Sequence, residues 1–72
     1  MTRKRNLRKV FGHNLRRHRG TLGISQEDLA EKAGLHRTYI GSVERGGRNV
    51  SIDNMERLAL AVGSTVQQLL ES

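Results

Sequence analysis

Cysteine is absent from this chain of 72 residues, and so is any long apolar run. Without thiols the chain can form neither a disulfide framework nor a thiolate metal site, as is usual in a reducing cytoplasm. The opening stretch MTRKRNLRKVF lacks the apolar centre of a signal peptide. No later segment approaches the roughly 18 continuous apolar residues of a membrane span. We therefore expect a cytoplasmic protein with no membrane partner.

Acidic residues are missing from the first third of the chain. All seven lie at or after Glu27, whereas the first 24 residues carry eight lysines and arginines. From Ser51 onward the balance reverses, although the whole chain keeps a formal net charge of +6. Such a field attracts a polyanion, so we expect the N-terminal part to face a phosphate backbone. Residues 1–5 form a predicted flexible basic arm that either follows a duplex, enters a minor groove or adds only nonspecific affinity.

The length allows one domain, residues 1–72, with a small core. Apolar spacing and capping residues predict an all-α chain of five helices, with no repeat or linker. The predicted helices run from about 6 to 21, 26 to 33, 37 to 44, 52 to 62 and 64 to 72.

Two of these helices carry clear apolar stripes. Leu7, Phe11 and Leu15 recur every four residues in the first helix and predict an inward stripe. The fourth helix follows an i, i+3, i+4, i+7 pattern formed by Met55, Leu58, Ala59 and Val62. Ser64 and Gln67 have the spacing of a capping box for the fifth helix.

The stretch from Ser25 to Gly46 has the punctuation of a helix-turn-helix. Ser25 and Asp28 approximate a capping box, and Gly34 can adopt the left-handed conformation that ends the first of the two helices. In the second helix, helical projection places Tyr39, Ile40 and Val43 on the packed side. The opposite, polar half consists of Arg37, Thr38, Gly41, Ser42 and Arg45. This geometry suits a helix that enters the DNA major groove, with Gly41 leaving room for a surface to approach.

The stretch LRRHRGTLGISQEDLAEKAGLHRTYIGSVERG, followed by NVSIDNMERLALAVGSTVQQLL, resembles the DNA-binding domain family of the lambda repressor, the 434 repressor and the Cro proteins. The run RTYIGSVERGGRN is similar to the recognition helix and following loop of restriction-modification controller proteins. The resemblance implies a compact five-helix lambda-repressor-like fold. It also implies a bacterial or phage-encoded transcriptional regulator, associated with the nucleoid, that binds a short palindromic operator in double-stranded DNA as a homodimer. RNA polymerase is left open as a second partner.

The resemblance assigns base contacts to the outer face of the third helix. The expected base-contacting residues are Arg37, Thr38, Tyr39 and Ser42. An arginine at the first turn can bond both guanine O6 and N7. Tyr39 has an alternative role at the rim of the core, and Gly41 omits a contact that a larger polar residue would make.

A second set of residues is expected to hold the DNA backbone. These residues are Gln26, His36, Arg45, Arg48 and Asn49. Gln26 stands at a helix N-terminus, which favours a phosphate. His36 is equally well explained as a weak N-cap, and the loop residues as ordinary solvated side chains.

Two structural roles also follow from the resemblance. Arg19 and Glu44 are expected to form an ion pair that ties the first helix to the third. Val66, Leu69 and Leu70 are expected at a dimer interface on residues 64–72, with completion of the monomer core as the alternative.

Enzymatic and metal-dependent functions find no support in the sequence. His13 and His18 lie five residues apart, on different helix faces, and His36 has no evident acidic partner. We expect no catalytic residue, cofactor or metal. Two alternatives to a regulator stay open: an antitoxin of the same fold that binds a toxin protein, and a nonspecific binder of RNA or membrane surfaces.

Overall fold

The computed structural model describes residues 6–71 as a bundle of helices, in which no strand is found between these limits. The elements are α1 (Leu7–Leu22), α2 (Gln26–Ala33), α3 (Arg37–Glu44), α4 (Ile52–Ala61) and α5 (Val66–Leu69). The five-helix prediction is therefore confirmed. The expected basic arm, with Arg3, Lys4 and Arg5, lies outside the described residues, as does Ser72.

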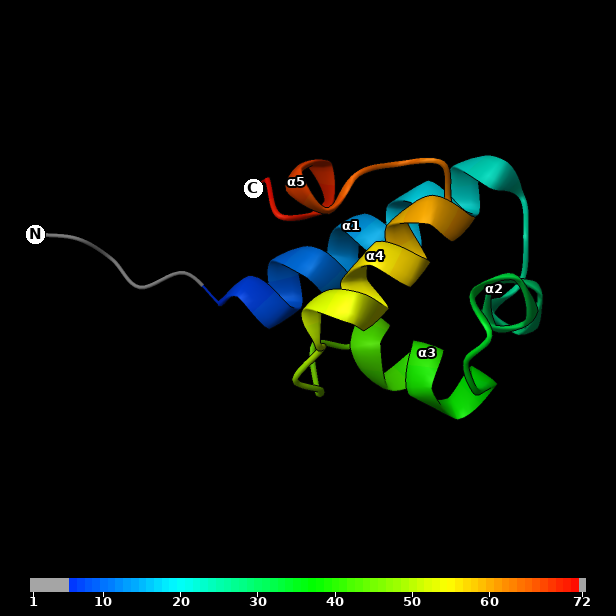
Figure 1. The fold of residues 1–72 in the computed structure, drawn as a ribbon, viewed down its shortest axis with the longest axis horizontal. Coiled ribbons are helices and arrows are strands. Elements are labelled where there is room, and N and C mark those ends of the chain that lie inside the picture. Colours follow the sequence, from blue (N-terminus) through cyan, green and yellow to red (C-terminus); the bar gives the residue numbers. More distant parts are fainter. Residues whose placement is uncertain (1–5, 72) are drawn as a thin grey trace, which may run out of the picture.

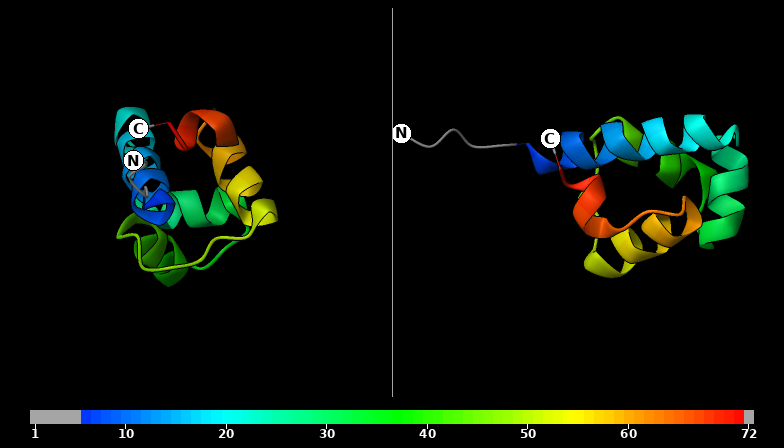
Figure 2. Two further views of the ribbon diagram at one scale, coloured as in Figure 1. Left: turned by 90° about the vertical axis from the view of Figure 1, so that its left-hand side faces the viewer. Right: turned by 90° about the horizontal axis from the view of Figure 1, so that it is seen from above.

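Helix α1, the longest of the helices, contacts two others. It packs against α3 and α5, while α2 contacts both α3 and α4. Figure 1 shows α5 along the upper edge of the molecule and α3, with the loop that follows it, along the lower edge. In the views of Figure 2, α4 and α5 lie on the other side of the bundle from α1. The helices enclose one core, whose largest fully buried side chains are Phe11, Leu15, Leu29, Ile40, Val43, Leu58 and Leu69.

The predicted turn chemistry of the helix-turn-helix is present. The Ser25 hydroxyl accepts a hydrogen bond from the Asp28 amide at 3.0 Å, and the Asp28 carboxylate accepts one from the Ser25 amide at 3.1 Å. Gly34 ends α2 with φ of 70°, a conformation that costs other residues strain. These contacts are local in sequence, which is why the pattern alone predicts them.

The predicted cap of α5 is wrong by one residue. Thr65, rather than Ser64, is the N-cap, and its hydroxyl accepts a hydrogen bond from the Gln68 amide at 3.1 Å. The Ser64 amide is already bonded to the carbonyl of Ala59 at 2.8 Å, so Ser64 belongs to the turn that follows α4. The Ser64 hydroxyl instead donates to the Gln68 side chain.

Three apolar residues differ from their predicted environments. Leu7 is 48% exposed because it lies in the first turn of α1, at the end of the bundle, whereas Phe11 and Leu15 are buried as predicted. Met55 is half-buried. Leu69 has no exposed surface, so it completes the monomer core and the expectation that it contacts a second copy is wrong.

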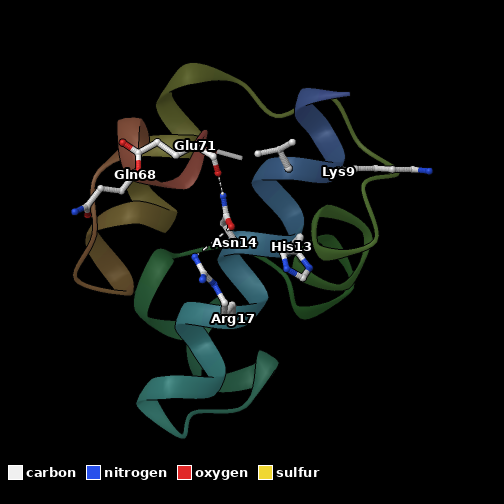
Figure 3. Close-up of a pocket in the computed structure, with 7 residues that line it drawn as sticks. Lys9, His13, Asn14, Arg17, Gln68 and Glu71 are labelled. Carbon is white, nitrogen blue, oxygen red and sulfur yellow. Dashed lines mark hydrogen bonds between the residues drawn. The ribbon is translucent and has the colours of Figure 1, made fainter. Parts of the chain in front are cut away.

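The buried side chain of Asn14 joins α1 to the end of α5. Its amide nitrogen donates to the carbonyl of Leu69 at 2.9 Å and to that of Glu71 at 2.7 Å. Its oxygen accepts a longer bond from Arg17 at 3.4 Å. Figure 3 shows this amide directed from α1 toward Glu71, and both residues line a groove together with Lys9, His13 and Gln68. Carbonyls that a short helix leaves without partners at its C-terminus are thereby satisfied.

Gly12 allows α1 and α3 to approach closely. A Cβ atom at this position would overlap the carbonyl oxygen of Val43 and lie 2.9 Å from that of Glu44. Both neighbours are backbone atoms of α3, so the contact can be relieved only by moving the helix. The interior of α1 is therefore matched to α3 through the absence of a side chain.

We expect Gly12→Ala to lower the free energy of unfolding by about 1 to 3 kcal/mol, because one extra methyl group overpacks a rigid contact. Gly20→Ala is the matched control in the same helix, since a Cβ there meets nothing within 4 Å. That variant should gain about 0.4 to 1 kcal/mol from the reduced entropy of the unfolded chain. Urea unfolding followed by circular dichroism measures both, and equal changes would contradict the close-packing argument.

Candidate nucleic-acid interface

The C-terminal end of α3 is held by a charged network that joins three helices. The Glu44 carboxylate accepts hydrogen bonds from Arg19 Nε at 2.7 Å and Nη2 at 3.0 Å, so the expected ion pair is present and bidentate. The same carboxylate accepts a third bond from Gln26 Nε2 at 3.0 Å. Arg19 Nη1 also donates to the carbonyl of Ile24 at 3.0 Å. Side chains from α1 and α2 thus converge on one acceptor in α3.

This network is sheltered from water, which strengthens it. The Glu44 side chain is 3% exposed and that of Arg19 is 17% exposed. Hydrogen bonding to Glu44 raises the pKa of Arg19 above its ordinary value, a change that burial opposes and the charge of Glu44 reinforces. A charged bidentate pair fixes the relative orientation of its two side chains as well as the distance between them. The orientation of α3 relative to α1 and α2 is therefore tightly constrained.

The outer face of α3 presents polar side chains at its first turn. Arg37 and Thr38 are exposed, and Ser42 is partly exposed one turn further on. Arg45 lies beside Ser42, with Nη2 at 3.5 Å from the hydroxyl oxygen. The first turn therefore carries a guanidinium and a hydroxyl on a rigid support, next to the amide end of the helix.

Gly41 does not form the open gap that the sequence suggests. It is buried, and a Cβ there would lie 3.2 Å from Arg45 Nη1 and 3.7 Å from Gln26 Oε1. Two long side chains therefore cover this glycine, and the expectation that an external surface approaches its backbone is wrong. Because Gly41 has no side chain, the ends of the Gln26 and Arg45 side chains can lie close to its backbone.

The residues expected to hold phosphate surround this face. Gln26 begins α2 and is partly buried, while His36 is the exposed N-cap of α3 and makes no side-chain capping hydrogen bond. Arg45 is exposed at the other end of α3, and Arg48 and Asn49 are exposed in the loop that follows. Figure 1 shows this loop beside α3, on the edge of the molecule away from α5.

Tyr39 has partners that sequence reasoning did not identify. Its hydroxyl accepts a hydrogen bond from Asn54 Nδ2 in α4 at 3.1 Å. The guanidinium carbon of Arg48 lies 5.3 Å from the centroid of its ring. Tyr39 is partly buried and packs against the core, as its alternative role at the core rim requires. Nothing in the sequence distinguishes Asn54 from an ordinary polar residue in the first turn of a helix.

The described part of the chain contains no group of three or more histidine, cysteine, aspartate or glutamate side chains placed to hold a metal. Within the same residues, no helix has the length and apolar character needed to cross a bilayer.

Comparisons with known proteins agree with this arrangement. A family model described as helix-turn-helix (HTH_3) matches residues 15–69. Over 65 residues, 90% of this chain and 77% of the relative, the chain is 46% identical to the control protein C.SmaI of Serratia marcescens.

Two solved structures are similar over most of the chain. One is the restriction-modification controller protein C.AhdI of Aeromonas hydrophila, with 47% identity and a TM-score of 0.82 over 86% of this chain and 94% of that protein. The other is the biofilm regulator SinR in complex with DNA, with 34% identity and a TM-score of 0.80 over 85% of this chain and 98% of that protein.

We expect Glu44→Ala to reduce the free energy of unfolding by about 2 to 3 kcal/mol, because it leaves the sheltered Arg19 guanidinium and the Gln26 amide without their acceptor. Glu31→Ala is the matched control, since Glu31 is an exposed carboxylate on α2 and should change stability by less than about 0.5 kcal/mol. Thermal unfolding of the three proteins measures the difference. Similar shifts for both variants would show that the network contributes nothing beyond a surface charge.

Proposed function

The chain belongs to the HTH_3 helix-turn-helix family, and restriction-modification control proteins are among the relatives of the chain. From this membership we propose how the protein binds DNA. It is a DNA-binding transcriptional regulator that presents the first turn of α3 to the major groove. The observation that carries this proposal is the exposed Arg37–Thr38 pair on a helix fixed by the Arg19–Glu44–Gln26 network. Because DNA in a bacterial cell lies in the cytoplasm, we propose the cytoplasm as the location of the protein.

Within the proposed complex, α3 supplies the base contacts. Arg37 is suited to bidentate bonding with a guanine, and Thr38 and Ser42 can bond to either kind of base edge. Gln26 and His36 stand at helix N-termini, where amide groups favour a phosphate. Arg45, Arg48 and Asn49 extend the backbone contacts along the loop.

We also propose that the regulator acts as a homodimer on a palindromic operator. Val66 and Leu70 are only partly buried, and Leu70 shares a mainly apolar groove of about 390 Å³ with Leu7, Phe11, Val50 and Met55, which Arg8 and Asn49 also line. A second copy seated on this groove would cover the exposed surface of Leu7. Two recognition helices related by a twofold axis would then address half-sites about 34 to 36 Å apart. Where the operator adjoins a promoter, RNA polymerase becomes a second partner.

Selection from randomised duplexes, followed by titration of the selected duplex, tests sequence-specific binding. We expect a motif with twofold symmetry. Arg37→Ala should cost roughly 1 to 3 kcal/mol on that duplex and relax the preference, whereas Arg48→Ala should weaken selected and random duplexes alike and lower the salt slope by about one. Enrichment of no motif would refute the regulator in favour of a nonspecific polyanion binder. Equal losses on both duplexes for Arg37→Ala would refute its base contact.

Leu7→Lys tests the proposed dimer surface. A lysine at this half-exposed position would place a charge in the apolar groove, so we expect analytical ultracentrifugation to show dissociation at concentrations where the parent protein is dimeric. Leu22→Lys is the matched control, because Leu22 is 51% exposed at the other end of α1, about 22 Å away along the helix. A parent protein that stays monomeric at high micromolar concentration, with and without the selected duplex, would remove the dimer.

A further inference from the structure

The loop between α3 and α4 is fixed at both ends by hydrogen bonds between residues that are close in the sequence. At its start, the Gly46 and Gly47 amides donate to the carbonyls of Val43 and Ser42, each at 2.9 Å. At its end, the Ser51 hydroxyl caps α4 by accepting a hydrogen bond from the Asn54 amide at 3.1 Å. Arg48 lies between these anchored points with an exposed side chain. The position of its guanidinium therefore depends on what that side chain touches.

The ring of Tyr39 is the contact that the structure provides for Arg48. At 5.3 Å from the centroid, the guanidinium is within the range of a cation–π interaction. The ring itself cannot drift, because its inner side packs against the core and its hydroxyl is bonded to Asn54. The cap that starts α4 also places Asn54, since the same residue donates its backbone amide to Ser51. A chain of contacts thus runs from α4 through Tyr39 to Arg48.

DNA could contact Tyr39 at its hydroxyl or at the face of its ring. Its hydroxyl is engaged by Asn54, and a face of its ring is covered by Arg48. A base that stacked on this ring face or donated to the hydroxyl would compete with these partners, and the hydroxyl keeps only its own proton to donate. An arginine already ordered on the ring, by contrast, can meet a phosphate without first losing the conformational freedom of a long side chain.

We propose that Tyr39 is a positioning residue that acts through Arg48, and that Asn54 fixes it in that role. The Tyr39 ring holds the Arg48 guanidinium beside α3, where it grips a DNA phosphate. This inference rests on the proposed function, because it assigns a part of the same DNA surface. It moves Tyr39 from the residues that select a sequence to those that hold the backbone.

The test is a double-mutant cycle between Tyr39 and Arg48, measured by fluorescence anisotropy on the selected duplex and on a random duplex of equal length from 50 to 200 mM salt. We expect Tyr39→Leu to weaken binding of both duplexes by roughly two- to tenfold, the cost of ordering one long side chain. The salt slope should fall by less than the value of about 0.9 that belongs to one whole phosphate contact. In the Arg48→Ala background, Tyr39→Leu should have no further effect.

Arg57→Ala is the matched control, because it removes the same charge from an exposed position on α4. In that background, the loss caused by Tyr39→Leu should persist in full. Tyr39→Phe, which keeps the ring but loses the bond to Asn54, should show only the smaller loss that Asn54→Ala shows. If Tyr39→Leu does not fold, Asn54→Ala gives the second cycle, since it leaves the ring present but releases its hydroxyl; its loss should likewise vanish with Arg48→Ala.

Two results would overturn the inference. One is a loss from Tyr39→Leu, or from Asn54→Ala in the second cycle, that is equally large with and without Arg48. The other is a loss confined to the selected duplex, which would make Tyr39 a reader of bases. A parent protein that does not prefer the selected duplex would instead refute the proposed function, and the cycle on the random duplex would still decide the role of Tyr39.

Discussion

The three hydrogen bonds accepted by the Glu44 carboxylate are the constraint on which the rest of the structure depends. Arg19 brings α1 to this group and Gln26 brings α2, so the C-terminal end of α3 is held from two directions. Gly12 adds a steric condition, because α1 and α3 touch through their backbones at that position. Removing a buried partner from such a pair is costly, since the remaining charge loses its compensation. These contacts fix the angle of α3 relative to α1 and α2.

Features of the fold that depend on neighbouring residues could be predicted from the sequence. Ser25, Asp28 and Gly34 define the helix-turn-helix through caps and a left-handed turn, and the structure contains each of them. The Arg19–Glu44 pair joins residues 25 apart, and only the family resemblance pointed to it. These elements fix the type of fold and the helix that faces outward.

Features that depend on tertiary contacts could not be predicted in the same way. Asn14 binds carbonyls more than 50 residues away, and Asn54 reaches Tyr39 across the boundary between two helices. Helical projection gives Gly41 a polar outer position, but it does not show that the long side chain of Arg45 covers it. The exposure of Leu7 likewise depends on where the bundle ends.

Helix α3, which Glu44 fixes, is the element that we propose meets DNA, with the following loop beside it. Backbone amide shifts in a nitrogen-15 spectrum, recorded as the selected duplex is added, test this claim directly. We expect the largest changes in residues 26–28, 36–42 and 45–49. Changes confined to the exposed basic side of α1, around Lys9, His13 and Arg17, with none in α3, would contradict it.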